Sequence, residues 1–148
     1  MSLDLGRTPY AQFCSLYQNL GPDNVTKDML AQVYANDVIF QDPMHEIHGL
    51  KKLSHYFISL YSNVISISFD FHKAEGNESS AMMYWTMTYR HPKLHKGKQD
   101  IRVEGVSLLQ WKDGKIIRHQ DIFDAGTMLY EHIPVLGWMI KKLKERLL

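Results

Sequence analysis

The sequence contains a single cysteine, Cys14, so no disulfide bond can form within the chain and a reducing compartment is expected. It also lacks an excess of either charge, because 17 Lys and Arg residues nearly match 16 Asp and Glu residues and leave a formal net charge of +1. Such a chain has no overall field to recruit nucleic acid or acidic lipid. No apolar run approaches the ~18 residues of a membrane-spanning helix, and no signal-peptide pattern is recognised. We therefore expect a cytoplasmic protein.

The rest of the composition is that of an ordinary globular protein, with 45% hydrophobic and 22% charged residues. A chain of 148 residues is long enough to bury a real core as one domain. The sequence has no internal repeats and no low-complexity linker. We therefore predict a single domain over residues 1–148, in which residues 125–148 form a C-terminal helical extension.

Apolar residues recur at helical spacing in the first half of the chain. Thr8-Pro9 is typical of a helix start and Gly21-Pro22 of a helix end, which predicts a first helix between them. A second helix is expected at about residues 25–35, followed by a short strand at residues 38–40. A third helix is expected after Gly49.

From residue 65 the apolar period changes from 3.6 to 2. Ile65, Ile67, Phe69 and Phe71 alternate with polar residues, which predicts a half-buried strand. A second strand is expected at residues 81–91, and two longer strands lie within residues 101–124. Three helices followed by a four-stranded antiparallel meander predict an α+β fold with the helices packed on one face of the sheet.

The two long strands meet at residues 112–115 (KDGK), which is the pattern of a β-hairpin. A two-residue turn at Asp113-Gly114 would pair Ser107 with Gln120, whereas a three-residue turn with a bulge at Gly114 would pair Ser107 with His119. A slip of one residue exchanges the two faces, and the bulged register separates apolar from charged residues better. We therefore predict the bulged register. Its buried face carries Val103, Gly105, Ser107, Leu109, Trp111, Ile117, His119, Asp121 and Phe123.

After a short helix capped by Asp124, residues from Pro134 onward have the pattern of a basic amphipathic helix. Its apolar residues are Val135, Trp138, Met139 and Leu143, and its basic residues are Lys141, Lys142, Lys144 and Arg146. Such a helix can lie on a membrane surface. A single short amphipathic helix more often packs on the sheet or on a second subunit, and we expect that role here instead of membrane binding.

Several landmarks recur in a known order: residues 34–43 (YANDVIFQDP), His48-Gly49, Gly105-x-Ser107, residues 113–116 (DGKI) and residues 119–124 (HQDIFD). Over about residues 10–124 the chain resembles the nuclear-transport-factor-2-like superfamily, specifically its SnoaL-like and ketosteroid-isomerase-like branch. The resemblance implies a curved antiparallel sheet wrapped into a cone, which three N-terminal helices close around an apolar pocket. It implies no single reaction, because the superfamily mixes enzymes, binding modules and scaffolds.

By position, the residues expected to point towards the pocket are Tyr17, Tyr34, Phe57, Trp85, Tyr89, Ser107, His119, Asp121 and Phe123. Most of them are aromatic, and aromatic faces stabilise planar apolar ligands by burial and stacking. A phosphate would require Arg, Lys or backbone donors instead. The lining therefore favours a flat or cyclic apolar carbonyl compound as the small ligand.

Asp42 matches the position of the general base in the ketosteroid isomerases, which move a proton between carbons next to a ketone. Burial at an apolar wall raises the pKa of a carboxylate towards the operating pH. The resemblance places Tyr17 at the oxyanion tyrosine and Tyr34 at a supporting tyrosine. Ser107 and Phe57 replace other members of that network, so strict steroid isomerisation is not implied. Alternatively, Asp42-Pro43 is only a turn at the end of a strand.

His119 and Asp121 are two residues apart on one strand, so they share a face at roughly 6.5–7 Å. That separation suits two groups that grip one ligand oxygen better than a direct hydrogen bond. In SnoaL-like polyketide cyclases an Asp in a similar late strand acts as the base and a nearby His polarises a carbonyl, so the resemblance implies these roles for Asp121 and His119. Alternatively, they are a buried polar pair satisfied by Tyr side chains or water.

His45, Glu46 and His48 have the residue types of a metal site, but their segment has the pattern of a loop without a third obvious ligand. Metal sites need three or four converging ligands. We expect neither a metal nor another cofactor.

Three hypotheses remain open: an acid–base enzyme, a non-catalytic module that binds an apolar ligand, and an interaction protein. The outer face of the hairpin mixes polar groups with Val106, Leu108, Ile116 and Ile122. Relatives commonly pair through this face, so we expect a homodimer.

Overall fold

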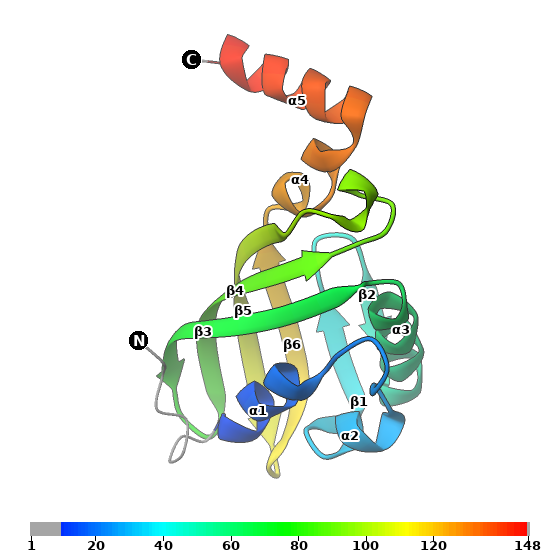
Figure 1. Ribbon diagram of the computed structural model, residues 1–148. Helices are drawn as coiled ribbons and strands as arrows, with labels where there is room; N and C mark the ends of the chain where they lie inside the picture. Colours follow the sequence, from blue (N-terminus) through cyan, green and yellow to red (C-terminus); the bar gives the residue numbers. More distant parts are fainter. Residues whose placement is uncertain (1–9, 148) are drawn as a thin grey trace.

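Figure 1 shows the computed structural model of the protein, which describes residues 10–147. A curved six-stranded sheet, in the order β2-β1-β6-β5-β4-β3, carries the helices α1, α2 and α3 on one side. The α+β class is therefore confirmed. The elements in chain order are α1 (Ala11–Asn19), α2 (Lys27–Ala31), β1 (Tyr34–Gln41), β2 (Glu46–His48), α3 (Leu50–Ser62), β3 (Ser66–Gly76), β4 (Ser80–Arg90), η1 (His95–Gly97), β5 (Ile101–Lys112), β6 (Lys115–Phe123), α4 (Ala125–Met128), η2 (Tyr130–His132) and α5 (Pro134–Arg146).

The N-terminal helices bury the apolar stripes that their spacing predicts. In α1 the buried side chains include Phe13 and Tyr17, four residues apart on one face. The expected helix start at Thr8-Pro9 lies outside the described residues. The second helix is shorter than predicted: Thr26 caps it by accepting a hydrogen bond from the Met29 amide, 3.2 Å away.

The sheet has two more strands than the predicted meander. Strands β3 to β6 form the antiparallel meander. Tyr34 and Ala35, predicted to end a helix, instead begin β1, which pairs in parallel with β6. Here the strand pairing with β6 overrides the local helical propensity. The segment predicted as a loop around residues 45–48 contains β2, which pairs with the end of β1.

The β5–β6 hairpin differs from the predicted register by two residues. Lys112 pairs with Lys115 across a two-residue turn, in which Asp113 and Gly114 both have positive φ angles (53° and 77°). The register then shifts by one residue, which leaves Ile117 as a bulge. Ser107 therefore pairs with Asp121 instead of His119.

The predicted three-residue turn is wrong, but the bulge restores the same alternation beyond it, so His119 is buried as expected. Near the turn, Ile116 and Ile117 lie on the opposite sides of the sheet from those predicted: Ile116 is fully buried and belongs to the core, whereas Ile117 is only half-buried. Ile116 is therefore not part of the outer face.

The C-terminal extension begins with α4, directly after β6, the last strand of the sheet. Asp124 caps α4, as predicted, and its Oδ1 accepts hydrogen bonds from the amides of Gly126 (2.8 Å) and Thr127 (3.3 Å). After η2, helix α5 projects away from the sheet (Figure 1). Within residues 10–147, no helix has both the length and the apolar character needed to cross a bilayer.

Candidate functional site

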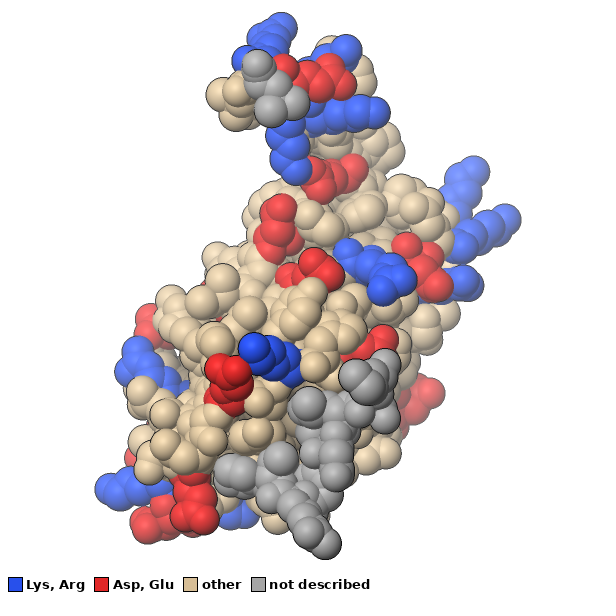
Figure 2. Space-filling model, turned by 90° about the vertical axis from the view of Figure 1, so that its left-hand side faces the viewer, with Lys and Arg blue, Asp and Glu red and all other residues tan. Residues whose placement is uncertain are grey.

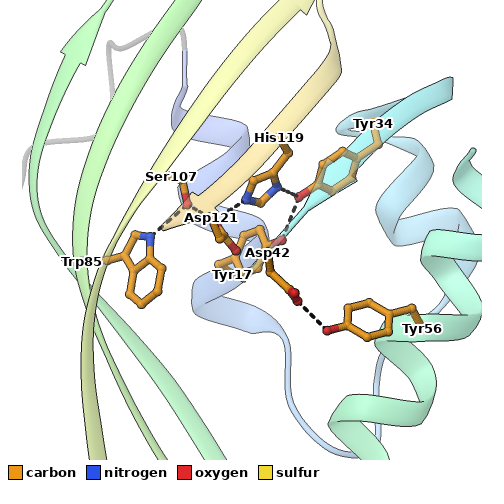
Figure 3. A network of polar contacts seen from close by, with 8 residues as sticks. All are labelled: Tyr17, Tyr34, Asp42, Tyr56, Trp85, Ser107, His119 and Asp121. Atoms are coloured by element: carbon orange, nitrogen blue, oxygen red, sulfur yellow. Dashed lines mark hydrogen bonds and ion pairs between the residues drawn. The ribbon is translucent and has the colours of Figure 1, made fainter. Parts of the chain in front are cut away.

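Six of the predicted site residues form one hydrogen-bonded series through the core, which we call the polar chain (Figure 3). The Tyr17 and Tyr34 hydroxyls are 2.7 Å apart, and Tyr34 Oη lies 2.8 Å from Nδ1 of His119. His119 Nε2 lies 2.6 Å from Oδ1 of Asp121. The same oxygen accepts a 2.5 Å hydrogen bond from the Ser107 hydroxyl, which itself accepts one of 2.9 Å from Nε1 of Trp85.

Strand pairing explains why these side chains meet. Ser107 and Asp121 are direct partners across β5 and β6, so their side chains are neighbours on one face. Trp85 pairs with Gly105, and the indole lies over this glycine. A Cβ atom on Gly105 would lie 2.3 Å from Cη2 of Trp85, so only glycine leaves room for the ring that donates to Ser107.

His119 is almost fully enclosed, with 1% of its side chain exposed. The rings of Phe40 and Phe13 lie edge-on to it, with centroids 4.8 and 5.4 Å away. A neutral imidazole satisfies every contact: Tyr17 donates to Tyr34, Tyr34 donates to Nδ1, and Nε2–H donates to Asp121. The spacing along the strand did not assure a direct His119–Asp121 hydrogen bond, but the structure has one, because the two side chains lean towards each other.

The tyrosines of this region remain protonated. Burial raises the pKa of Tyr17 and of Tyr34 well above the usual value, and the negative charge of Asp121 raises both further. The hydrogen bond with Tyr17 acts in the opposite direction on the pKa of Tyr34. Burial, followed by the charge of Asp121, also raises the pKa of Tyr61. These hydroxyls are therefore available as hydrogen-bond donors.

The polar chain reaches the surface at Asp121, whose side chain is 16% exposed. Both hydrogen bonds that its carboxylate accepts from residues 10–147 end at Oδ1. Two half-buried aromatic residues lie beside Trp85: the ring centroids of Phe123 and Phe69 are 6.2 and 5.5 Å from that of Trp85. Asp121 is thus a partly exposed carboxylate held by a buried imidazole and by the hydroxyl that accepts from this indole.

Asp42 brings a second carboxylate to the same end of the sheet (Figure 3). Phe40 and Gln41 pair in parallel with residues 119 and 120, so Asp42 follows in step with Asp121. Its Oδ1 accepts hydrogen bonds from the amides of Met44 (2.8 Å) and His45 (2.7 Å). This is the side-chain arrangement of a turn at the end of a strand.

The other oxygen of Asp42 accepts a 2.7 Å hydrogen bond from Tyr56, a residue that the sequence reasoning missed. Burial raises the pKa of Tyr56, and its hydrogen bond to Asp42 raises it further. The available signal was helical spacing, since Tyr56 follows Leu53 by three residues and lies at the edge of the buried stripe of α3.

The remaining predicted residues lie in two places. Phe57 is buried against Phe40 and Tyr17, with centroids 5.4 and 6.2 Å away. Tyr89 belongs to a second cluster with Leu94, Ile101 and Val103, and its hydroxyl donates to the Met128 carbonyl of α4. Burial raises the pKa of Tyr89 to about 12. Tyr89 therefore anchors α4 and has no hydrogen bond to the polar chain.

The candidate metal residues do not converge. His48 Nε2 lies 3.6 Å from Glu46, and both side chains are exposed. Across residues 10–147, no group of three or more His, Cys, Asp and Glu side chains could hold a metal ion. Neither His119 nor Asp121 lines any of five hollows that open on the surface of residues 10–147. The pocket that the resemblance implies stays a prediction.

The chain resembles a known domain family and several solved structures. The family model described as the SnoaL-like domain matches residues 16–119. No curated protein matches the chain. Among solved structures, a candidate SnoaL-like polyketide cyclase from Jannaschia sp. CCS1 has a TM-score of 0.70 at 11% identity, over 87% of this chain and 94% of that one.

Two further structures have the same fold. An LEH-like epoxide hydrolase from M. tuberculosis has a TM-score of 0.65 at 15% identity, over 90% of this chain and 93% of that one. A protein with a ketosteroid isomerase-like fold from Catenulispora acidiphila, solved with trimethylamine, has a TM-score of 0.68 at 12% identity, over 87% of this chain and 92% of that one. At these identities the likeness concerns the fold alone.

Proposed function

The chain belongs to the SnoaL-like domain family, and from this premise we propose that it is a cytoplasmic small-molecule enzyme. Its reaction is cofactor-free acid–base chemistry on an apolar carbonyl compound, by isomerase- or cyclase-like proton transfer. The observation that carries the proposal is the Asp121 carboxylate, which is held at Oδ1 by His119 and Ser107 while its side chain remains partly exposed.

In this mechanism Asp121 is the base. Its free oxygen takes a proton from the carbon next to the carbonyl, and the electron pair of the broken C–H bond moves to the carbonyl oxygen as an enolate. Isomerisation returns the proton from Asp121 to another carbon. In cyclisation the enolate carbon attacks a second carbonyl carbon, the π electrons of that carbonyl move to its oxygen, and Asp121 returns the proton to the resulting alkoxide. Tyr17 and Tyr56, which burial keeps protonated, are the donors proposed for the enolate oxygen, and each would exchange its present hydrogen bond, to Tyr34 and to Asp42, for one to the ligand.

His119 is a positioning residue in this proposal. With 1% of its side chain exposed, it contacts Asp121 and Tyr34 and not the solvent. Its Nε2–H fixes the direction of the Asp121 carboxylate. The role that the resemblance implies for His119, polarisation of a ligand carbonyl, would require this hydrogen bond to be exchanged for one to the ligand.

One observation favours a second candidate function, a non-catalytic module for an apolar ligand. Within the described part of the chain, every buried side-chain nitrogen and oxygen has a hydrogen-bond partner. A fully satisfied polar network stabilises a unique core without any catalytic role. The two candidates share the ligand class and differ only in whether Asp121 moves a proton.

The ligand class is tested by thermal shift against steroid-like, polyketide-like and nucleotide panels. We expect apolar carbonyl compounds to raise the melting temperature, because binding to the native state alone stabilises by about 2.7 kcal/mol at one hundred times Kd. Phe123→Ser should weaken this shift, whereas Ile58→Ser, at an exposed residue of α3, should not. Stabilisation by nucleotides or sugar phosphates alone would contradict the ligand class.

The outer face of the sheet supports a proposal about assembly. Tyr84, Val106 and Ile122 form one row across β4, β5 and β6, and Met82 and Leu108 lie beside it. Four of these side chains are exposed, and Val106 is half-exposed. A contiguous apolar patch of this kind is typical of a protein–protein contact. We therefore propose a homodimer through this face.

The dimer is tested by light scattering at micromolar concentrations, where we expect twice the mass of one chain. Replacing Leu108 and Ile122 by Glu should yield monomers, because two carboxylates would be desolvated in the contact. The matched control replaces Ile58 and Leu60, two exposed residues of α3, by Glu and should leave the dimer intact. A wild-type mass equal to one chain would rule the dimer out.

A further inference from the structure

Helix α5 exposes an apolar side that the rest of the described chain leaves uncovered. Val135, Met139 and Leu143 follow one another at intervals of four residues and therefore share a face. Val135 is 72% exposed and Leu143 59% exposed, and no residue of α5 is buried. The other long helix, α3, buries its corresponding stripe.

A different side of α5 attaches it to the protein. Gly137 lies so close to η2 that an added Cβ would meet the Glu131 carbonyl oxygen at 2.2 Å, and Lys144 forms an ion pair with the Glu131 side chain. The helix thus packs on η2 and projects from the body of the molecule, as Figure 1 shows. The expected packing of this helix on the sheet is wrong, whereas packing on a second subunit, the other part of that expectation, stays a prediction. The apolar stripe points away from the attachment.

The charge of α5 differs from that of the remaining chain. Residues 134–146 carry four basic residues and one acidic residue, whereas all other residues together carry thirteen basic and fifteen acidic ones. Figure 2 shows Lys and Arg side chains gathered on this helix at the top of the view. Lys144 is held by its ion pair with Glu131, whereas Lys142 lies about 100° from Leu143 around the helix. The flexible stem of Lys142 can follow an apolar surface while its ammonium group stays in water.

A second basic segment lies at the same end of the molecule. The loop between β4 and β5 exposes Lys93, Lys96 and Lys98. Its His95 Nε2 lies 2.8 Å from Nδ1 of His132, in the η2 segment that supports α5. The loop and the helix are therefore held together as one basic end with an apolar stripe.

We propose that α5 binds the surface of an anionic lipid bilayer. The helix lies in the interface with its apolar stripe among the acyl chains and its lysines at the headgroups. An anionic surface complements the charge of α5 and of the basic loop. A second copy of α5 would bring like charges together, so self-association through this helix is disfavoured. Trp138, 62% exposed on the flank of the stripe, suits the same interface. This binding does not depend on the proposed chemistry.

The test measures co-sedimentation of the full chain with vesicles made of equal parts phosphatidylcholine and phosphatidylglycerol, or of phosphatidylcholine alone. We expect binding to the anionic vesicles, a blue shift of Trp fluorescence, and weaker binding at high salt. Met139→Ser with Leu143→Ser should reduce the partition coefficient by at least about tenfold. Lys141→Gln with Lys142→Gln should reduce it by a similar factor.

Matched controls change the same residue types on α3. Ile58→Ser with Leu60→Ser, and Lys51→Gln with Lys52→Gln, alter exposed residues and should leave vesicle binding unchanged. Circular dichroism must show unchanged melting for the α5 variants, which substitute exposed side chains only. The proposal is overturned if the wild type binds neither vesicle, or if the α3 variants lose as much binding. It is also overturned if the α5 variants change the light-scattering mass while the wild type does not bind anionic vesicles.

Discussion

Asp121→Asn is expected to lower the rate of proton transfer on a bound carbonyl compound by about 10²–10⁴-fold, the usual contribution of a general base. Stability should change much less, because Asn keeps an oxygen that can accept from Ser107 and from His119. Exchanging two charge-assisted hydrogen bonds for neutral ones should cost about 2 kcal/mol or less. If Asp121 is catalytic, the variant should therefore lose activity and keep most of its stability. If Asp121 is structural, the variant should lose stability.

The matched control is Asp70→Asn, an exposed carboxylate on β3, which should alter neither property. Unfolding is followed by circular dichroism, and ligand binding by thermal shift. A large loss of melting temperature in Asp121→Asn, with ligand binding unchanged, would assign Asp121 to a structural role and favour the non-catalytic binding module.

Gly105→Ala is expected to destabilise the fold by about 3 kcal/mol, at the upper end of the usual cost of overpacking a core. The added methyl group would lie 2.3 to 2.8 Å from three ring atoms of the buried Trp85. The rigid indole must move, and it then loses its hydrogen bond to Ser107. For a domain of this size, the melting temperature should fall by about 10 °C.

Gly21→Ala is the matched control, since the nearest atom to its added Cβ is 4.0 Å away and the change should cost little. Thermal unfolding of the two variants side by side checks the prediction. Equal melting temperatures for both would mean that Trp85 does not occupy the space above Gly105.

Alternation along the strands was the part of the site most readily predicted from the sequence. The period of two in β5 and in the distal part of β6 placed Ser107, His119 and Asp121 on the buried side without knowledge of the turn. The length of the turn could not be predicted in this way. The observed turn is one residue shorter than the predicted one, and a bulge at Ile117 compensates for the difference. Pattern reasoning fixes the face of a strand but not which residues are paired across it.

Contacts between distant segments could not be predicted in the same way. Tyr34 lies in a segment with helical character, and only pairing with β6 makes it a strand residue. The hydrogen bond between His119 and Asp121 depends on side-chain torsions that spacing along a strand does not determine. The role of Tyr56 could not be predicted for a related reason, because the turn after β1 brings its hydrogen-bond partner, Asp42, close to it.

The most direct test of the central claim is deuterium incorporation, followed by NMR, into cyclic apolar ketones incubated with the full chain in D₂O. The ketones are those that stabilise the protein in the thermal-shift panel. We predict exchange at the carbon next to the carbonyl with the wild type, and loss of this exchange with Asp121→Asn while the ketone still binds. Exchange at the same rate with both proteins, or with neither, would contradict the assignment of Asp121 as the base.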